Sequence, residues 1–280
     1  MNIDLHSHSC QSDGVLAPAE VAARARANGV DWWALTDHDE TSGLAQAAQA
    51  AGQLGMGFIP GIEISATFCQ KTVHIVGLGI QADHPALQAG LADIRRSRFA
   101  RAHQLDALLA DCGIEHAYAG ALQYVDNPDL ISRVHFARHL LQAGHVKSLQ
   151  QAFDRYLGEG KRAFVPTRWA LLEDAVAWIL AAGGKAVIAH PGRYKYTPQQ
   201  HDALFSAFKD LGGQAIEVVT GSHTPAQYQR YARLARQYGF QASRGSDFHA
   251  PGTGRVDLGA MPPLPDGLTP VWADWIQESP

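Results

Sequence analysis

The segment Ile3-Asp4-Leu5-His6-Ser7-His8 places two histidines at the end of a short apolar strand. Side chains two positions apart on a strand point to the same face, so His6 and His8 could hold one metal ion between them. Taken alone, they could equally be surface histidines in a loop. The sequence Asp247-Phe248-His249 repeats the arrangement after the last expected strand, with a carboxylate in place of one imidazole. This recurrence favours a metal site.

Between these two segments, expected strands and helices alternate in two stretches of the chain. Prolines at helix starts and glycines at helix ends mark several boundaries. We expect strands over 3–5, 31–36, 58–64, 72–78, 185–189, 215–219 and 241–245. We expect helices over 18–28, 42–54, 171–182, 198–211 and 225–238. Such alternation indicates an α/β protein with a mostly parallel sheet, and polar residues at strand ends favour a closed (β/α) barrel.

The middle of the chain has a different pattern, with helical periodicity and almost no strand signal. We predict helices over 87–112, 133–143 and 148–156. The run of arginines from Arg95 to Arg101 is expected to form a solvated helix face. We therefore assign residues 1–90 and 165–280 to the barrel, and residues 91–164 to a helical insertion subdomain that caps the active site.

Composition excludes several classes of protein. The 280 residues include 14 histidines but only 3 cysteines, and the cysteines are widely spaced, which argues against a disulfide framework or a thiolate zinc site. The formal net charge of −4 argues against stable binding of duplex nucleic acid. No secretory signal and no apolar run of about 18 residues is present, so we expect a cytoplasmic protein without a membrane span.

Five further residues are candidate ligands, each with an alternative role. His38 and His190 follow apolar strands directly, where a buried core histidine is the simpler interpretation. Glu63 and His74 lie within apolar strands, and a buried carboxylate needs a cationic partner. Asp13, in Ser12-Asp13-Gly14, is either a turn residue or a ligand.

With His6, His8, Asp247 and His249 these make nine residues, which is too many for one ion because zinc takes about four ligands and octahedral metals about six. Nine ligands fit two or three divalent ions that share carboxylates. The mixture of imidazoles and carboxylates suits manganese, zinc or iron.

The motifs H-S-H, S-D-G, T-D-H-D, G-I-E-I, V-H-I-V-G, A-H-P and S-D-F-H occur in the order typical of the PHP (polymerase and histidinol phosphatase) family. The chain resembles this family over about 1–85 and 165–280. The resemblance implies a distorted seven-stranded (β/α) barrel with up to three metals, most often manganese. It implies that all nine residues are metal ligands, namely His6, His8, Asp13, His38, Glu63, His74, His190, Asp247 and His249. It also implies that Glu63 is the carboxylate that bridges two of the metal ions.

The helical insertion, with Ile131-Ser-Arg-Val-His-Phe-Ala-Arg138, resembles one subgroup more closely. That RNase AM-like subgroup removes the 3′-phosphate from nucleoside 3′,5′-bisphosphates and trims short RNA from its 5′ end. The resemblance therefore implies a small phosphorylated substrate, either a nucleotide or short RNA. It leaves the oligomeric state open.

The hypothesis for the mechanism is that clustered metals activate water for in-line attack on a phosphomonoester. Asp247 and Glu63 are the candidate catalytic carboxylates. Arg133 and His135 are candidates for both catalysis and substrate binding, because guanidinium groups suit phosphate. Ser132, Arg193 and His223 are further candidates for substrate binding, and for each of these three a role outside the site is the simpler alternative.

Four other functions remain as rivals. Histidinol phosphatase shares the metal set, and an exonuclease acting on longer nucleic acid would also use it. An amidohydrolase would carry H-x-H on its first strand, but it normally needs a lysine at a mid-barrel strand end, whereas Lys185 lies at a strand start. A non-catalytic metal-dependent binding module is disfavoured by the complete ligand set.

Overall fold

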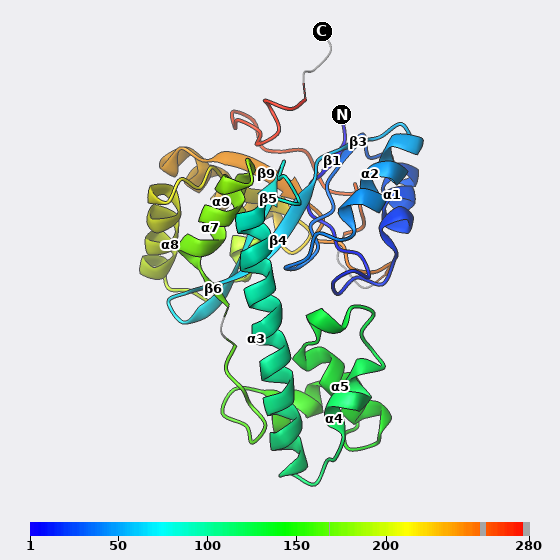
Figure 1. Cartoon of the computed structure of the whole chain (residues 1–280). Coiled ribbons are helices and arrows are strands. Elements are labelled where there is room, and N and C mark those ends of the chain that lie inside the picture. The colour runs from blue at the N-terminus through cyan, green and yellow to red at the C-terminus, as the bar shows by residue number, and fades with distance from the viewer. Residues whose placement is uncertain (168, 253–255, 277–280) are drawn as a thin grey trace. The chain divides into compact units, whose positions relative to one another are not determined.

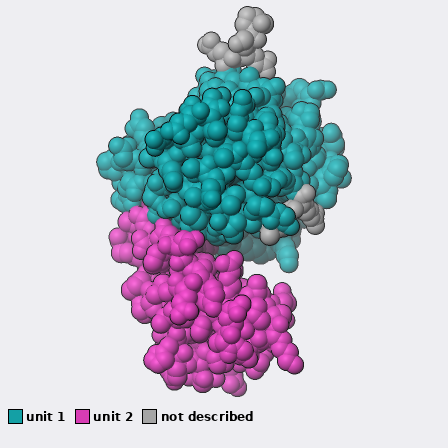
Figure 2. All heavy atoms as spheres, turned by 90° about the vertical axis from the view of Figure 1, so that its right-hand side faces the viewer, with its two compact units in different colours: residues 1–90, 170–280 teal, residues 91–169 magenta. Residues whose placement is uncertain are grey.

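A computed structural model describes residues 1–167, 169–252 and 256–276. The chain divides into two compact units, which Figure 2 shows in different colours. The first unit consists of Met1–Gly90 and Ala170–Pro280, and the second of Leu91–Trp169. No helix among the described residues has the length and apolar character needed to cross a membrane.

The first unit contains two sheets. The smaller sheet is parallel and has the order β1-β2-β3, formed by β1 (Ile3–Asp4), β2 (Trp32–Trp33) and β3 (Gly57–Phe58). The larger sheet has the order β6-β4-β5-β7-β8-β9. Its strands are β4 (Gly61–Phe68), β5 (Lys71–Leu78), β6 (Ala170–Leu171), β7 (Lys185–Ile188), β8 (Ala215–Thr220) and β9 (Gln241–Gly245).

Isolated bridges join the two sheets at both ends. His38, beyond β2, pairs with Glu63 of β4, and Ser7, beyond β1, pairs with Phe248 beyond β9. The Leu5 backbone N–H also donates to the Arg244 carbonyl at 3.0 Å. Buried side chains from both sheets form a shared core that includes Ile3, Leu5, Ala34, Val76, Leu78, Val187, Ala189 and Ala215.

These observations confirm the mixed α/β class. The seven-stranded barrel stays a prediction, because the described residues form nine strands in two sheets. The strand expected over 58–64 is interrupted at Ile59-Pro60, where proline has no N–H to donate. β5 is antiparallel to β4 because the two form a hairpin, in which Cys69 and Gln70 have the positive φ angles of a type I′ turn, 45° and 61°.

Helices flank the sheets of the first unit, with α1 and α2 side by side on one flank and α7 to α9 on the other (Figure 1). At the starts of α8 and α9, Thr197 and Thr224 accept hydrogen bonds from the backbone N–H of Gln200 and Gln227, and a proline follows each threonine. The helices are α1 (Pro18–Ala27), α2 (Leu44–Gln53), α7 (Leu172–Ala181), α8 (Pro198–Asp210) and α9 (Pro225–Tyr238), and a 3-10 turn spans Pro191–Arg193.

The second unit has no strand among its described residues. It begins within α3 (Pro85–Ala110) and continues through α4 (Ala117–Leu122), a 3-10 turn (Pro128–Leu130), α5 (Arg133–Gln142), α6 (Leu149–Ala152) and a π-helical turn (Phe153–Leu157). It has its own buried core, which includes Leu105, Leu109, Ile114, Phe136, Leu140 and Leu157.

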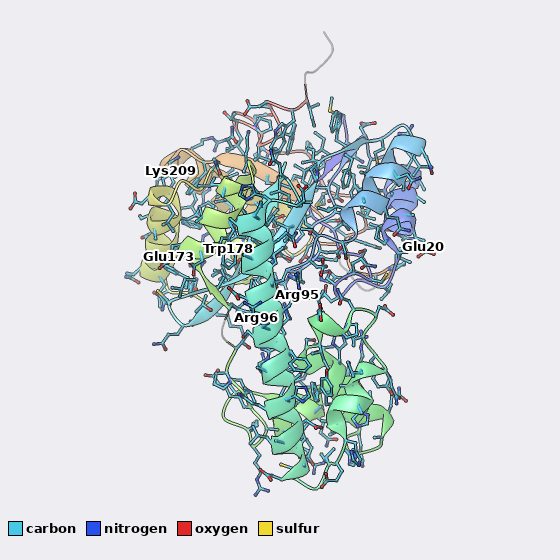
Figure 3. The ribbon with its side chains drawn as sticks, viewed as in Figure 1. Glu20, Arg95, Arg96, Glu173, Trp178 and Lys209 are labelled. Atoms are coloured by element: carbon cyan, nitrogen blue, oxygen red, sulfur yellow. The ribbon has the colours of Figure 1, made fainter. Side chains whose placement is uncertain are left out.

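Gly90 allows α3 to pack closely against α7. A Cβ atom at Gly90 would lie 2.4 Å from the Trp178 indole of α7, whereas one at Gly52 in α2 would meet nothing within 4 Å (Figure 3 labels Trp178). We expect Gly90→Ala to destabilise the protein by about 1–3 kcal/mol through overpacking. The control Gly52→Ala should stabilise it by roughly 0.5–1 kcal/mol through helix propensity. Urea unfolding of both variants measures the difference, and equal effects would contradict the close packing of α3 on α7.

Candidate metal centre

The two histidines that follow β1 are fully buried and lie close together. The Nε2 atoms of His6 and His8 are 3.2 Å apart. His6 Nδ1 lies 2.7 Å from Glu217 Oε1, which fixes the ring proton on Nδ1. The Nε2 atom of His6 faces that of His8, and the two rings converge as the sequence predicts.

Glu63 of β4 lies at the centre of the histidines. Its Oε1 is 2.9 Å from both His74 Nδ1 and His190 Nε2. Its Oε2 is 3.1–3.2 Å from nitrogen atoms of three more rings, those of His6, His8 and His38. Burial raises the pKa of the Glu63 carboxyl, but the surrounding histidines outweigh burial and hold the pKa well below its usual range. The carboxylate is therefore an anion at neutral pH.

The segment after β9 contributes Asp247 and His249, and the loop after β1 contributes Asp13. Asp247 Oδ1 lies 3.3 Å from His8 Nε2 and 3.5 Å from His6 Nε2. His249 Nε2 lies 3.3 Å from Asp13 Oδ1, and the Asp13 side chain is 48% exposed. The backbone of Asp247 has a positive φ angle of 56°, and that of His190 one of 27°. Such angles are strained and are typical of functional sites.

Three groups of these side chains have ligand atoms within 4.8 Å of one another. The separations of 3.2–3.5 Å among His6, His8, Glu63 and Asp247 are those expected around one ion, since ligands about 2.0–2.2 Å from a metal lie roughly 3.0–3.5 Å from each other. The groups are His6, His8, Glu63 and Asp247; His8, Asp13, His38 and His249; and His38, Glu63 and His74.

Several buried atoms in this cluster have no hydrogen-bond partner among the described residues. They include Nδ1 of His8, His38 and His190, and Oε2 of Glu63. A buried polar atom without a hydrogen-bond partner is costly, so these atoms are suited to bind a ligand. These nitrogen and oxygen donors fit divalent metal ions.

The histidines in the cluster differ in basicity. Burial lowers the pKa of His8, but the nearby carboxylates of Asp247 and Glu63 outweigh burial and raise the pKa to about 10. For His38, burial dominates and lowers the pKa to about 3, despite the nearby charges of Glu63 and Asp13. His38 is therefore neutral at pH 7 and retains a lone pair for a metal.

Two aspartates that flank His38 hold the loops in place. Asp37 accepts hydrogen bonds from the backbone N–H and hydroxyl of Ser9, both at 2.7 Å, and from the Ser12 hydroxyl at 2.6 Å. Asp39 accepts from the backbone N–H of Ser65 at 2.7 Å and from its hydroxyl at 2.9 Å. The motif T-D-H-D thus places His38 between two anchored carboxylates.

Sequence reasoning missed two residues that support the centre. Glu217 is 1% exposed; its Oε1 binds His6, and its Oε2 accepts from the His190 backbone N–H at 2.6 Å. The Tyr194 hydroxyl donates to the Ala189 carbonyl at 2.7 Å and accepts from the His74 backbone N–H at 2.9 Å. Glu217 lies in an apolar strand, which is the signal that identified Glu63, so the sequence could have indicated it.

Two candidate substrate-binding residues lie in the first unit. Arg193, half-exposed, donates from Nη1 to Asp247 Oδ2 at 2.8 Å. His223 is buried, and both of its nitrogens have partners: Nδ1 lies 3.1 Å from the Val218 carbonyl, and Nε2 accepts from the Gly192 N–H at 2.9 Å. His223 therefore holds the turn that carries Arg193. Contact of either residue with substrate stays a prediction.

The other candidates lie in the second unit, at the start of α5. His135 is buried, and its Nδ1 accepts from the Ser132 backbone N–H at 3.0 Å. Arg133 is partly buried; its Nη1 donates to the Leu157 carbonyl at 3.3 Å, and its guanidinium lies 5.6 Å from the Phe164 ring centre. Their catalytic and substrate-binding roles stay predictions.

Curated relatives match almost the whole chain. A 3′,5′-nucleoside bisphosphate phosphatase from Chromobacterium violaceum is 50% identical over 273 residues, covering 98% of this chain and 96% of the relative. A 5′-3′ exoribonuclease from Haemophilus influenzae is 43% identical, and its alignment covers 96% of this chain and 97% of the relative. Among solved structures, one described as an amidohydrolase from Chromobacterium violaceum, with bound sulfate and no metal, has a TM-score of 0.89 at 49% identity, covering 98% of this chain and 95% of that one.

A putative metal-dependent phosphoesterase from Bifidobacterium adolescentis has a TM-score of 0.76 at 25% identity, covering 96% of this chain and 92% of the other. The family model for the PHP domain matches residues 4–210, a range that includes Asp13, His38, Glu63, His74 and His190. The matched range covers more than half of the chain. Most of the matched residues lie in the first unit, which also contains the cluster of histidines and carboxylates. The chain therefore belongs to the PHP family.

Proposed function

We propose that this protein is a metal-dependent phosphoesterase that removes the 3′-phosphate from nucleoside 3′,5′-bisphosphates. The observation that carries the proposal is the convergence of histidines and carboxylates on Glu63, in a chain 50% identical to a 3′,5′-nucleoside bisphosphate phosphatase. Relatives named as 5′-3′ exoribonucleases support a second activity on short RNA. Both activities cleave a phosphoester bond, so one centre serves both.

Two or three divalent ions fit the donor set, with manganese as the proposed metal and zinc or iron as alternatives. An imidazole must be neutral to bind a metal and then has one free lone pair, so His8 and His38, each in two ligand groups, would serve one ion at a time. Glu63 has two carboxylate oxygens that face different histidines, which makes it the proposed bridge. When bound, such ions activate water and neutralise phosphate oxygens.

The chain's own residues would orient the substrate and handle the protons. Arg193 has several N–H donors and uses one of them on Asp247, which leaves others for a phosphate oxygen. Asp247 is the proposed group that transfers a proton near the scissile bond, while Glu217 keeps the ring proton of His6 on Nδ1. We propose that Arg133 and His135, with Ser132, bind substrate groups outside the metal centre, which is the predicted role of the helical unit as a cap.

A comparison of substrates tests the proposal. Removal of metal with a chelator should abolish phosphate release, and Mn²⁺ should restore it. Rates should then be highest for a nucleoside 3′,5′-bisphosphate when compared with a 5′-mononucleotide, histidinol phosphate and a short 5′-phosphorylated RNA. A strong preference for histidinol phosphate would contradict the proposed substrate. Absence of phosphate release from every substrate by a metal-replete preparation would contradict the enzyme assignment.

Glu217→Gln tests the support of the metal centre by a residue that does not itself face the ligand cluster. Glutamine keeps the size of the side chain but removes the carboxylate that holds the Nδ1 proton of His6. We expect metal affinity to fall by about 10–100-fold, as for other carboxylates that orient metal-binding histidines. Metal titration followed by phosphatase activity and by bound-metal analysis measures the loss. Unchanged affinity would mean that the bond between Glu217 and His6 does not tune the centre.

Arg133→Ala tests substrate binding by the helical unit. Loss of a charge-assisted hydrogen bond to phosphate should lower kcat/KM by about tenfold or more while metal content stays the same. Arg138→Ala is the matched control, because Arg138 lies on the same helix with an exposed side chain. Loss of metal from the Arg133 variant, or an equal effect in the control, would contradict the assignment.

A further inference from the structure

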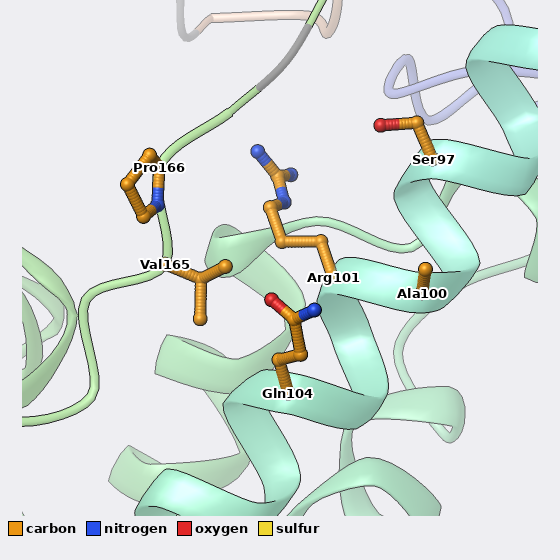
Figure 4. Close-up of a pocket in the computed structure, with 6 residues that line it drawn as sticks. All are labelled: Ser97, Ala100, Arg101, Gln104, Val165 and Pro166. Carbon is orange, nitrogen blue, oxygen red and sulfur yellow. The ribbon is translucent and has the colours of Figure 1, made fainter.

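The helical unit buries two arginines that the sequence predicts on a solvated helix face. Arg98 and Arg101 are each only 7% exposed, so the prediction is wrong for these two residues. Their guanidinium carbons lie 4.4 Å and 5.4 Å from the ring centre of Trp169 in the same unit. Figure 4 shows the cavity that Arg101 lines together with Val165 and Pro166. Packing within the helical unit therefore accounts for the burial of both arginines.

The first unit buries a carboxylate, Asp4 at the end of β1, to which the proposed function gives no role. Its side chain is 0% exposed. Its Oδ1 accepts from the backbone N–H of Ser246 at 2.8 Å and of His6 at 3.4 Å, and its Oδ2 accepts from that of Gly259 at 2.9 Å. His6 is a candidate metal ligand, and Ser246 directly precedes another, Asp247. Asp4 thus contacts the backbone of two ligand segments.

These two ligand segments run side by side where the chain after β9 meets the chain after β1. The Asp247 backbone N–H donates to the His6 carbonyl at 2.8 Å, and the bond from Ser246 to Asp4 is a second link between the segments. The backbone of Asp247 has a φ angle of 56°, a strained conformation that persists only where surrounding contacts hold it. Asp4 supplies one of those contacts through the residue before Asp247.

The Gly259 donor belongs to residues 257–261, which follow the last strand and are called the strap below. The Asn2 side chain donates from Nδ2 to the Gly259 carbonyl at 2.9 Å. Arg244 of β9 is 6% exposed and donates from Nη2 to the Met261 carbonyl at 2.6 Å. The strap is therefore fastened to the beginning of the chain and to the last strand, on either side of Asp4.

The backbone of the strap fits only glycine at position 259. Gly259 has a φ angle of 70°, and a Cβ atom there would lie 2.6 Å from Val30. Gly267 has a similar φ angle of 72°, but a Cβ atom there would have an ordinary contact of 3.9 Å with Arg236. A substitution of Gly259 therefore displaces its N–H from Asp4, whereas a substitution of Gly267 adds backbone strain alone.

We propose that Asp4 is a positioning residue for the metal centre and that it transmits the docking of the strap to His6 and Asp247. This proposal rests on the proposed function, in which both of these residues bind metal. The strap holds one oxygen of the carboxylate through Gly259, and the other oxygen holds the N–H groups of Ser246 and His6. Fixing the backbone of the ligands in this way raises metal affinity, because the ligands need less reorganisation when the ion binds.

The first test compares Asp4→Asn with Asp31→Asn. Asparagine places an NH₂ group at one of the two oxygen positions, so Asp4→Asn loses the bond to either Ser246 or Gly259 and breaks the link. Asp31 is exposed and accepts the Asn2 backbone N–H at 2.7 Å. Asp31→Asn therefore makes the same chemical change at the surface and is the matched control.

Affinity for Mn²⁺ is measured by competition with a fluorescent chelator, and bound metal is measured by elemental analysis after dialysis. Asp4→Asn should weaken Mn²⁺ binding by about 10–100-fold, as for other groups that orient metal ligands, and Asp31→Asn should leave it unchanged. A purely structural role for Asp4 predicts a lower Tm of the metal-free protein with unchanged Mn²⁺ affinity. That result would overturn the proposal.

Gly259→Ala tests the strap itself, with Gly267→Ala as the control, and decides the matter alone if Asp4→Asn does not fold. Gly259→Ala should weaken Mn²⁺ binding by about tenfold or more, and Gly267→Ala should not. In the Asp4→Asn background, Gly259→Ala should cause little further loss because the link is already broken. Additive losses, or unchanged affinity in Gly259→Ala, would overturn the proposal.

Metal binding is measured without turnover, so failure of this proposal and failure of the proposed function give different results. Weaker Mn²⁺ binding in Asp4→Asn, in a protein that hydrolyses no phosphoester, would contradict the proposed function and still support the role of Asp4. Phosphate release by a protein whose Mn²⁺ affinity is unchanged in Asp4→Asn would support the function and overturn the role of Asp4.

Discussion

The buried carboxylate of Glu63 is the constraint on which the cluster of histidines and carboxylates depends. A fully buried anion is stable only with opposite charge or strong donors around it, and five histidine rings surround this one. Those rings come from the chain segments after β1, β2 and β7 and from β5. One glutamate on β4 therefore requires distant parts of the chain to meet at a single point.

Other buried carboxylates orient the histidines or hold the backbone beside them. Glu217 orients His6 and accepts the backbone N–H of His190, and Asp39 ties the chain beside His38 to Ser65 of β4. Burial raises the pKa of Asp37, although the charge of His8 and the hydrogen bonds from Ser9 and Ser12 act in the opposite direction. Hydrogen bonds from backbone N–H groups and hydroxyls therefore anchor the chain beside the clustered histidines.

The residues that converge in the cluster could be predicted from the sequence. The strand directions and the packing that bring them together could be predicted only in part. His6, His8, Asp247 and His249 were identifiable because strand alternation puts neighbours two apart on one face. The antiparallel pairing of β5 with β4 could not be predicted in the same way. It depends on a tight turn with positive φ angles at Cys69 and Gln70, and neither position is a glycine that would mark such a turn. The burial of Arg98 and Arg101 was also missed, because it depends on Trp169, a residue distant in the sequence that packs against both.

The discontinuity of the first unit bears on the order in which the protein is made. A ribosome synthesises the segment with His6, His8 and Glu63 first, then residues 91–169, and only afterwards the segment with His190, Asp247 and His249. The intervening helices have a buried core of their own. The nascent chain then carries only part of the set of nine candidate ligands for the time needed to synthesise the residues between His74 and His190. A centre that used all nine candidate residues could therefore be completed only after His249 has been synthesised.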